Sequence, residues 1–139
     1  MKKLDEITEG LFRATSAERV TVRLRIDRVG FPVISEWRSE LVDSLLGRAS
    51  HELEDTPVVR FLAKTRTVLV QPDVRVAEPR PHAEVIEAGV RAQILVPVCV
   101  ADSMVGIVSV HSIIPRQWSE IDVGAAQDSG RRVAEFLAC

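Results

Sequence analysis

Residues 91–111 carry the sequence RAQILVPVCVADSMVGIVSVH, in which two apolar runs flank the short connection Ala101-Asp102-Ser103. The first run, 91–100, is apolar nearly throughout, which is typical of a strand whose two faces are both covered. The second run, 104–111, is rich in β-branched side chains that suit the other arm of a hairpin. This stretch therefore predicts a buried β-hairpin, with 91–100 as a central strand.

The segment after this hairpin predicts the most clearly marked helix of the chain. Ser119 is a favoured N-cap residue, and Asp122 lies three residues later, where it can return a second capping hydrogen bond. Trp118 precedes the cap and can pack against Val123 one turn into the helix. One helical face then carries four small or apolar residues, Ala126, Gly130, Val133 and Leu137.

The N-terminal part predicts a helix followed by a second hairpin. Leu4, Ile7 and Leu11 recur at helical spacing. In 19–27, valine, leucine and isoleucine alternate with arginine and threonine, so the arginines are expected on a solvated strand face. After a turn at 28–30, residues 31–38 predict the partner strand, with Phe31 and Trp37 on the same side.

The middle of the chain predicts shorter elements. Residues 39–55 suggest a helical turn and a polar loop, and Thr56-Pro57 begins a helix with a side-chain cap and a proline at the first position. Residues 68–70 predict a short strand, and the proline-broken connection 71–81 can hold a loop over a cleft. A brief helix at 82–88 is expected to end at Gly89. Strands joined by hairpins indicate an α+β fold with an antiparallel sheet.

Composition limits the classes of function. A length of 139 residues predicts a single domain, 1–139, and a net charge of -2 without a basic stripe argues against direct binding of nucleic acid. No stretch has the apolar run of a secretory signal or a membrane span, so no membrane partner is expected. Cys99 and Cys139 are the two cysteines, and this low cysteine content favours a reducing, cytoplasmic location.

Three segments in fixed order resemble the C-terminal half of a GAF domain: Gly89-Val90-Arg91-Ala92-Gln93-Ile94-Leu95-Val96-Pro97-Val98, then Val105-Gly106-Ile107-Val108-Ser109-Val110-His111, then Pro115-Arg116-Gln117-Trp118-Ser119-Glu120-Ile121-Asp122. The Pro-Arg-x-Trp run is most similar to GAF domains of the phytochrome and cyanobacteriochrome kind. The resemblance implies a sheet of five to six strands, with pocket-forming helices and loops on one face and terminal helices, which commonly pair into homodimers, on the other. Such domains usually regulate an output module, so the chain is expected to be a stand-alone regulator or a piece of a larger signalling protein.

The sequence also departs from the patterns of this group. Photoreceptor GAF domains commonly attach a bilin through a cysteine placed directly before a histidine, and the corresponding position here is Pro81-His82. On that alignment, covalent attachment of a bilin at this place is excluded. The Asn-Lys-Phe-Asp-Glu signature of cyclic-nucleotide-binding GAF domains is also missing, which weakens that ligand class. The sequence leaves the cofactor and the ligand unidentified.

Strand position and the resemblance together select six candidate ligand-binding residues: His111, His82, Trp37, Arg91, Ile94 and Ser109. His111 shares a strand face with Ser109 and can direct a hydrogen-bonding ring into a cavity; the alternative is a strand-end histidine partly in water. His82 can instead be a plain helix-start residue. Trp37 can be ordinary strand packing, and Arg91 can be a structural arginine.

Three functional hypotheses follow. The first is a non-catalytic, small-molecule-sensing regulatory domain, and the second is a ligand-free dimerisation or protein-docking module. The third is an enzyme related to the GAF-like free methionine-R-sulfoxide reductases, which require pocket cysteines that Cys99 alone does not supply. No metal site is expected, because His51, His82 and His111 lack metal-like spacing with one another or with Cys99. No phosphate loop or nucleophile elbow is present either, which favours a protein that is not an enzyme.

Overall fold

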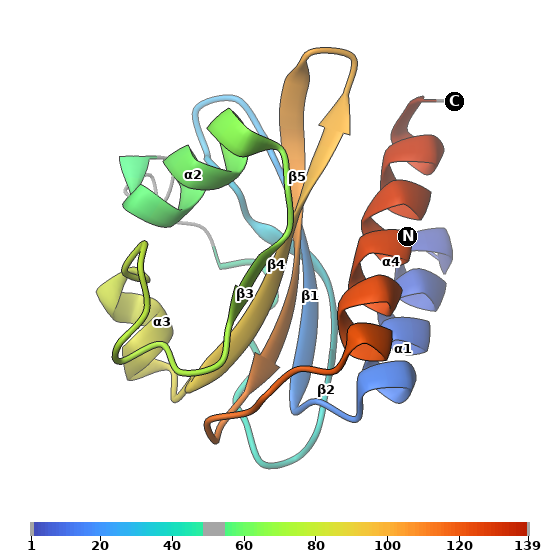
Figure 1. Cartoon of the computed structure of the whole chain (residues 1–139). Coiled ribbons are helices and arrows are strands. Elements are labelled where there is room, and N and C mark those ends of the chain that lie inside the picture. Colours follow the sequence, from blue (N-terminus) through green and yellow to red (C-terminus); the bar gives the residue numbers. More distant parts are fainter. Residues whose placement is uncertain (1, 49–54, 139) are drawn as a thin grey trace.

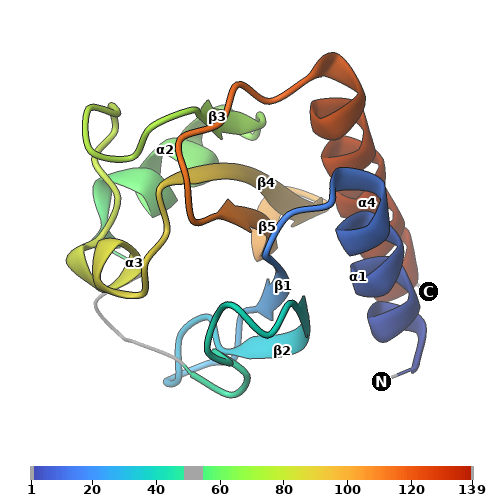
Figure 2. The same cartoon turned by 90° about the horizontal axis from the view of Figure 1, so that it is seen from below.

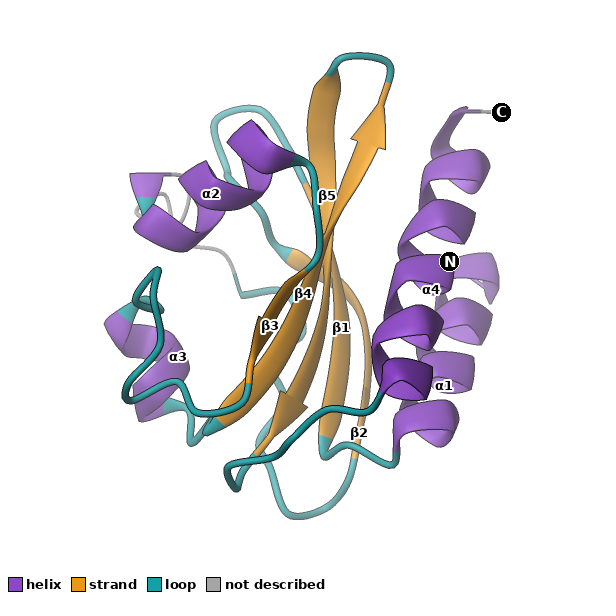
Figure 3. Ribbon diagram, in the orientation of Figure 1, coloured by secondary structure: helices purple, strands orange, loops and turns teal. Residues whose placement is uncertain are grey.

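The protein folds as a five-stranded sheet between two pairs of helices (Figures 1 and 3). The computed structural model describes residues 2–48 and 55–138. Within them the elements are α1 (Lys2–Thr15), β1 (Arg19–Leu24), β2 (Val33–Arg38), α2 (Pro57–Thr65), β3 (Leu69–Gln71), α3 (Ala83–Glu87), β4 (Ala92–Val100), β5 (Ser103–Ser112) and α4 (Glu120–Ala138).

The strands lie in the order β2-β1-β5-β4-β3, and every neighbouring pair is antiparallel. The α+β class and the antiparallel sheet predicted from the hairpins are therefore confirmed. Strand β5 is the third of the five in this order and pairs with β1 on one side and β4 on the other. Strand β4 lies between β5 and β3, so it is an interior strand of the sheet, and it is buried along most of its length as expected.

Helices α1 and α4 lie side by side on one face of the sheet (Figure 2). Their apolar residues form one buried cluster with the facing side chains of β1, β4 and β5. Gly130 lies at a close approach of α4 to the sheet, since a Cβ atom there would lie 2.5 Å from Cγ1 of Val96. The glycine is therefore required by packing and not by backbone conformation.

The start of α4 is fixed by the cap that the sequence predicts. The amide of Asp122 donates to Ser119 Oγ at 3.0 Å, and the amide of Ser119 donates to Asp122 Oδ2 at 3.2 Å. Arg116 adds a clamp: Nη2 donates to the Thr15 carbonyl at 2.6 Å and to Asp122 Oδ2 at 3.1 Å, while its guanidinium stacks over Trp118. The Pro-Arg-x-Trp run thus joins the end of α1 to the start of α4.

Helices α2 and α3 cover the opposite face. Thr56 caps α2 through its Oγ1, which accepts from the Val59 amide at 3.3 Å, and Pro57 occupies the first turn as predicted. His82 caps α3, and Gly89 follows it with a φ of 86°. Both sequence predictions for helix boundaries are confirmed here.

The polar side of β1 is not the solvated face that the alternation predicts. Arg19 and Thr21 are 1% and 0% exposed, because the α2–α3 layer and the segment 39–48 cover this side of the sheet. Strand β1 also ends at Leu24, earlier than the predicted residue 27, and β2 begins at Val33. Residues 25–32 form the connection, with positive φ at Arg28 and Gly30.

Among the described helices, none has the length and apolar content that crossing a bilayer requires.

Candidate functional site

A cavity of about 310 Å³ lies between the sheet and the layer formed by α2 and α3. Ligand cavities in proteins start at about this size. Its wall is largely apolar and contains a few polar groups. The lining residues are Arg23, Phe31, Leu45, Arg48, Thr56, Val58, Val59, Pro81, His82, Glu84, Val85, Ala88, Val90, Gln93, Leu95, Ile107, Ser109 and His111.

A row of polar side chains crosses all five strands on the cavity side of the sheet. Directly paired residues of antiparallel strands point to the same face. The strand register places five such residues in succession from β2 to β3: Arg38, Arg19, His111, Gln93 and Gln71. We call this set the polar row. His111 and Gln93 are its members that line the cavity.

His111 is a neutral imidazole with a defined tautomer. Burial, and then the positive charges of Arg19 and Arg23, hold its pKa well below the usual 6.5. Arg19 Nη1 lies 3.1 Å from His111 Nδ1. Because a guanidinium only donates, Nδ1 must accept, and the ring proton is on Nε2. The described residues offer Nε2 no hydrogen-bond acceptor, so this donor is available at the cavity wall.

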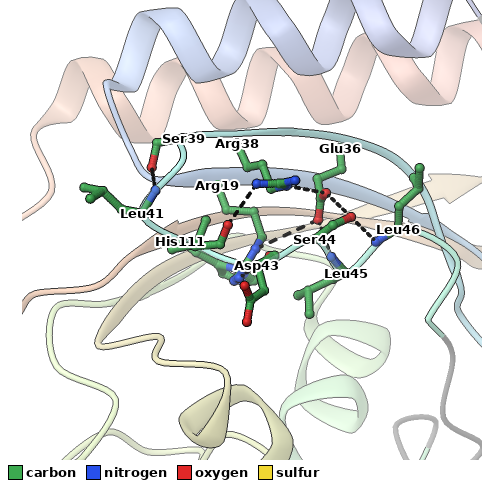
Figure 4. Close-up of polar contacts among 11 residues, drawn as sticks. Arg19, Glu36, Arg38, Ser39, Leu41, Asp43, Ser44, Leu45, Leu46 and His111 are labelled. Atoms are coloured by element: carbon green, nitrogen blue, oxygen red, sulfur yellow. Dashed lines mark hydrogen bonds and ion pairs between the residues drawn. The ribbon is translucent and has the colours of Figure 1, made fainter.

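Arg19 holds the segment 39–48 against the sheet (Figure 4). Its Nη2 donates to the Asp43 carbonyl at 2.9 Å, and its Nε lies 3.9 Å from the Glu36 carboxylate. Glu36 in turn accepts from Ser44 Oγ and from the Leu45 amide, both at 2.6 Å. Burial lowers the pKa of Arg19, and the anionic groups of Glu36 and Asp43 oppose this shift. Leu45 thereby reaches the cavity wall.

The other end of the polar row is fixed by two amides. Gln71 Nε2 donates to the Pro79 carbonyl at 2.7 Å, and Gln93 Nε2 donates to Gln71 Oε1 at 2.8 Å. A carbonyl only accepts, so Pro79 determines the orientation of both amide groups. Gln93 Oε1 has no donor among the described residues.

A guanidinium lies elsewhere on the wall. Arg23 Nη1 donates to the Phe31 carbonyl at 2.8 Å, which leaves the rest of its donor fork for other partners. Burial lowers the pKa of Arg23, and the carboxylate of Glu84 opposes this shift. Both residues line the cavity, so the wall carries charges of both signs.

The structure brings three of the six predicted site residues to the cavity: His111, His82 and Ser109. Trp37 and Ile94 are instead on the face covered by α1 and α4. Trp37 pairs with Val20, which belongs to the cluster beneath these helices, and Ile94 is a member of that cluster. Arg91 precedes β4 and does not line the cavity.

Sequence reasoning did not select Gln93 or Arg23, although both line the cavity. The signal for Gln93 was present, since it is a polar residue in a strand predicted to be covered on both faces. The arginines of β1 alternate with apolar residues, but alternation does not distinguish a solvated face from the wall of an internal cavity.

Among the residues that the structure describes, neither cysteines nor metal-binding clusters contribute to this cavity. No lining residue among those described is a cysteine, and Cys99 is half-buried near the β4–β5 turn. Pro81 and His82 both line the cavity, so the predicted replacement of a linking cysteine falls at its wall. The described residues contain no group of three or more side chains able to hold a metal ion. His51 and Cys139 lie outside the described residues.

The GAF domain family model matches residues 2–137. The chain belongs to the GAF domain family. No protein with curated function matches the sequence.

Solved structures with the same GAF fold include several photoreceptors. The cyanobacteriochrome receptor PixJ superimposes with a TM-score of 0.82 at 20% identity over 99% of this chain and 93% of that one. The phycocyanobilin-bound GAF domain of a cyanobacterial phytochrome superimposes with a TM-score of 0.80 at 20% identity, over 99% of this chain and 85% of that one. The chromophore-binding domain of a bacteriophytochrome from R. palustris superimposes with a TM-score of 0.81 at 18% identity, over 96% of this chain and 53% of that one. At identities this low, these superpositions show a shared fold and no more than that.

Proposed function

We propose that this GAF domain is a non-catalytic sensor that binds a small organic molecule in the cavity and regulates a signalling partner. The observation that carries the proposal is the cavity itself, with its apolar wall and the buried, neutral His111 that presents a fixed donor. Such a site is typical of small-molecule recognition, where apolar walls supply affinity and a few fixed polar groups supply specificity.

The ligand is held without a covalent bond. One structural neighbour is described as phycocyanobilin-bound, but the described lining residues of this chain include no thiol for a linkage. A volume of about 310 Å³ is at the lower end of the range for ligand sites, which favours a molecule of one to three rings over a linear tetrapyrrole. The guanidinium of Arg23 can accommodate an anionic substituent.

The absence of catalysis is part of the proposal. His111 is buried and neutral, and its Nδ1 already accepts from Arg19, so that nitrogen is occupied. The half-buried Cys99 does not line the cavity, which removes the support for a reductase that uses pocket cysteines.

We further propose a cytoplasmic homodimer that acts on an output module through α1 and α4. Ile121 of α4 is 79% exposed, and Phe12, Phe136 and Leu137 are only partly buried. Exposed apolar side chains on paired helices are suited to a second copy. Light scattering during gel filtration tests this point, and a monomer at high concentration would contradict it.

The sensor proposal is tested by thermal unfolding against a panel of nucleobases, pterins, aromatic carboxylic acids and bilins. A ligand at about 100 times its Kd adds about 2.7 kcal/mol to the free energy of unfolding, which raises the Tm measurably. The variant Ala88→Phe places a bulky ring at the cavity wall and should abolish the shift. Ala83→Phe, on the exposed side of α3, is the matched control and should retain it. If no compound raises the Tm, the proposal is contradicted.

A further inference from the structure

We propose that Phe31 limits the length of the ligand that the cavity accepts. Its side chain separates the cavity from a second, more open hollow of about 300 Å³, which lies at the end of the sheet where β4 turns into β5. The inference rests on the proposed ligand-binding function and adds the residue that selects compact ligands over elongated ones.

The second hollow is bounded by three parts of the chain that meet beside the β4–β5 turn. They are α2, the connection between β1 and β2, and the start of β5 (Figure 1). Its lining residues are Arg25, Phe31, Val59, Ala63, Ser103 and Met104. Arg25, Ala63 and Ser103 are exposed, whereas Phe31 and Val59 are 4% and 7% exposed. The hollow therefore opens to solvent on one side and ends on two buried side chains on the other.

Among the described residues, Phe31 and Val59 line both the hollow and the cavity. A side chain that faces two spaces forms the wall between them, so this wall is one layer of side chains thick. Phe31 has the larger side chain and contributes more of the wall. The two spaces have similar volumes, so joining them would about double the room for a ligand. The joined space would still be of ordinary size for a ligand site.

Phe31 is a fixed partition, because the main chain on both sides of it is held. Arg23 Nη1 donates to the Phe31 carbonyl at 2.8 Å. Pro32 follows, and a proline restricts the residue before it to extended conformations. The Val33 amide then donates to the Arg48 carbonyl at 3.1 Å. The ring itself is packed in a buried apolar cluster, so an elongated ligand would clash with it.

The end of the cavity at this partition is apolar. Phe31, Val59 and Ile107 belong to the same buried cluster, and all three line the cavity. The part of a ligand that reaches the partition is therefore expected to be hydrocarbon. Each methylene group that is buried there should strengthen binding about fourfold, until the chain meets the ring of Phe31.

The test uses 4-alkylbenzoic acids whose alkyl chains run from methyl to octyl. Their dissociation constants are measured by titration calorimetry for the wild-type protein, Phe31→Ala and Phe31→Leu. For the wild-type protein, we expect the affinity to stop rising at a short chain. For Phe31→Ala, we expect it to continue rising by about fourfold per carbon over further methylene groups. Phe31→Leu disturbs the core less and should move the limit in the same direction.

Phe61 supplies the matched control, because it packs against the same cluster but lines neither the cavity nor the hollow. Phe61→Ala should lower the stability and leave the chain-length limit at its wild-type position. Ala63→Phe fills the hollow from its exposed side. In the Phe31→Ala background it should restore the shorter limit, and alone it should leave the limit unchanged.

The same chain-length limit in the wild-type protein and in both Phe31 variants overturns the inference. It leaves the sensor proposal standing, since that proposal requires no particular ligand length. An equal lengthening in Phe61→Ala also overturns the inference, because the effect would then come from a loosened core. If none of the acids binds to any of these proteins, the inference is again overturned, and thermal unfolding with the wider ligand panel decides the proposed function separately.

Discussion

Arg19 Nη1 and His111 Nδ1 lie 3.1 Å apart in the buried layer between the sheet and the cavity. The two residues are 92 positions apart in the sequence and are brought together by the pairing of β1 with β5. This contact determines the tautomer of His111 and the direction of the donor that reaches the cavity wall. Burial is the main cause of the lowered pKa that keeps the ring neutral, and the charge of Arg19 adds to it.

The tautomer can be observed directly. We predict that His111 is a neutral imidazole protonated on Nε2 at pH 7, because the Arg19 guanidinium can only donate to Nδ1. Long-range ¹H–¹⁵N correlation spectra distinguish the two neutral tautomers and the imidazolium. A spectrum with the proton on Nδ1 would contradict the assigned network.

His111 also makes stability depend on pH. The pKa of His111 is lowered in the folded protein from the ordinary histidine value of 6.5. As the pH falls below that value, the unfolded chain therefore binds more protons than the folded protein does. The free energy of unfolding should therefore be highest above this pH and fall as the pH decreases, by at most about 1.4 kcal/mol per pH unit. Urea unfolding of His111→Gln should show a flatter pH dependence. His82→Gln, which retains His111, should keep the wild-type slope.

Glu36→Gln tests the support of the segment 39–48. The carboxylate of Glu36 is 5% exposed, faces Arg19 and accepts two hydrogen bonds from that segment. Its removal leaves the buried Arg19 without its nearest anion, and we expect a loss of about 1–3 kcal/mol in stability. Amide exchange at Leu45 should also accelerate. The exposed Glu40→Gln is the control, and an equal effect there would refute the argument.

Gly130→Ala tests the approach of α4 to the sheet. The new Cβ atom would lie 2.5 Å from Val96 Cγ1, and the stiff, β-branched valine cannot move away easily. We expect a loss of about 1–3 kcal/mol from overpacking. In a Val96→Ala background, Gly130→Ala should instead raise the free energy of unfolding, because alanine is favoured over glycine in a helix by about 1 kcal/mol. Chemical denaturation of the four proteins of this cycle measures both effects.

Local signals in the sequence were sufficient for most of the fold. The reciprocal cap of Ser119 and Asp122 depends on neighbours three residues apart, and the proline after Thr56 marks the start of α2 in the same way. Hairpin connections predicted the antiparallel sheet. The position of β5 at its centre could not be predicted, because the pairing of β5 with β1 joins distant parts of the chain.

The candidate site was only partly predictable. His111 and Ser109 were identified because they lie two residues apart on one predicted strand and so share a face. His82 was identified from its place in the family pattern. Trp37 was assigned to the wrong side of the sheet, since periodicity gives the relative orientation of residues and not which face holds the cavity. The contact between Arg19 and His111 required the tertiary fold and had no local signature.

The most direct test of the sensor account is mass spectrometry of the protein purified from its own source, under native and then denaturing conditions. The account predicts a non-covalent adduct in the native spectrum that is lost on denaturation, together with a dimer mass. Loss of the adduct from Ala88→Phe, and its retention by Ala83→Phe, would locate it in the cavity. A bare protein that also fails to bind any member of the ligand panel would contradict the sensor and favour the docking module.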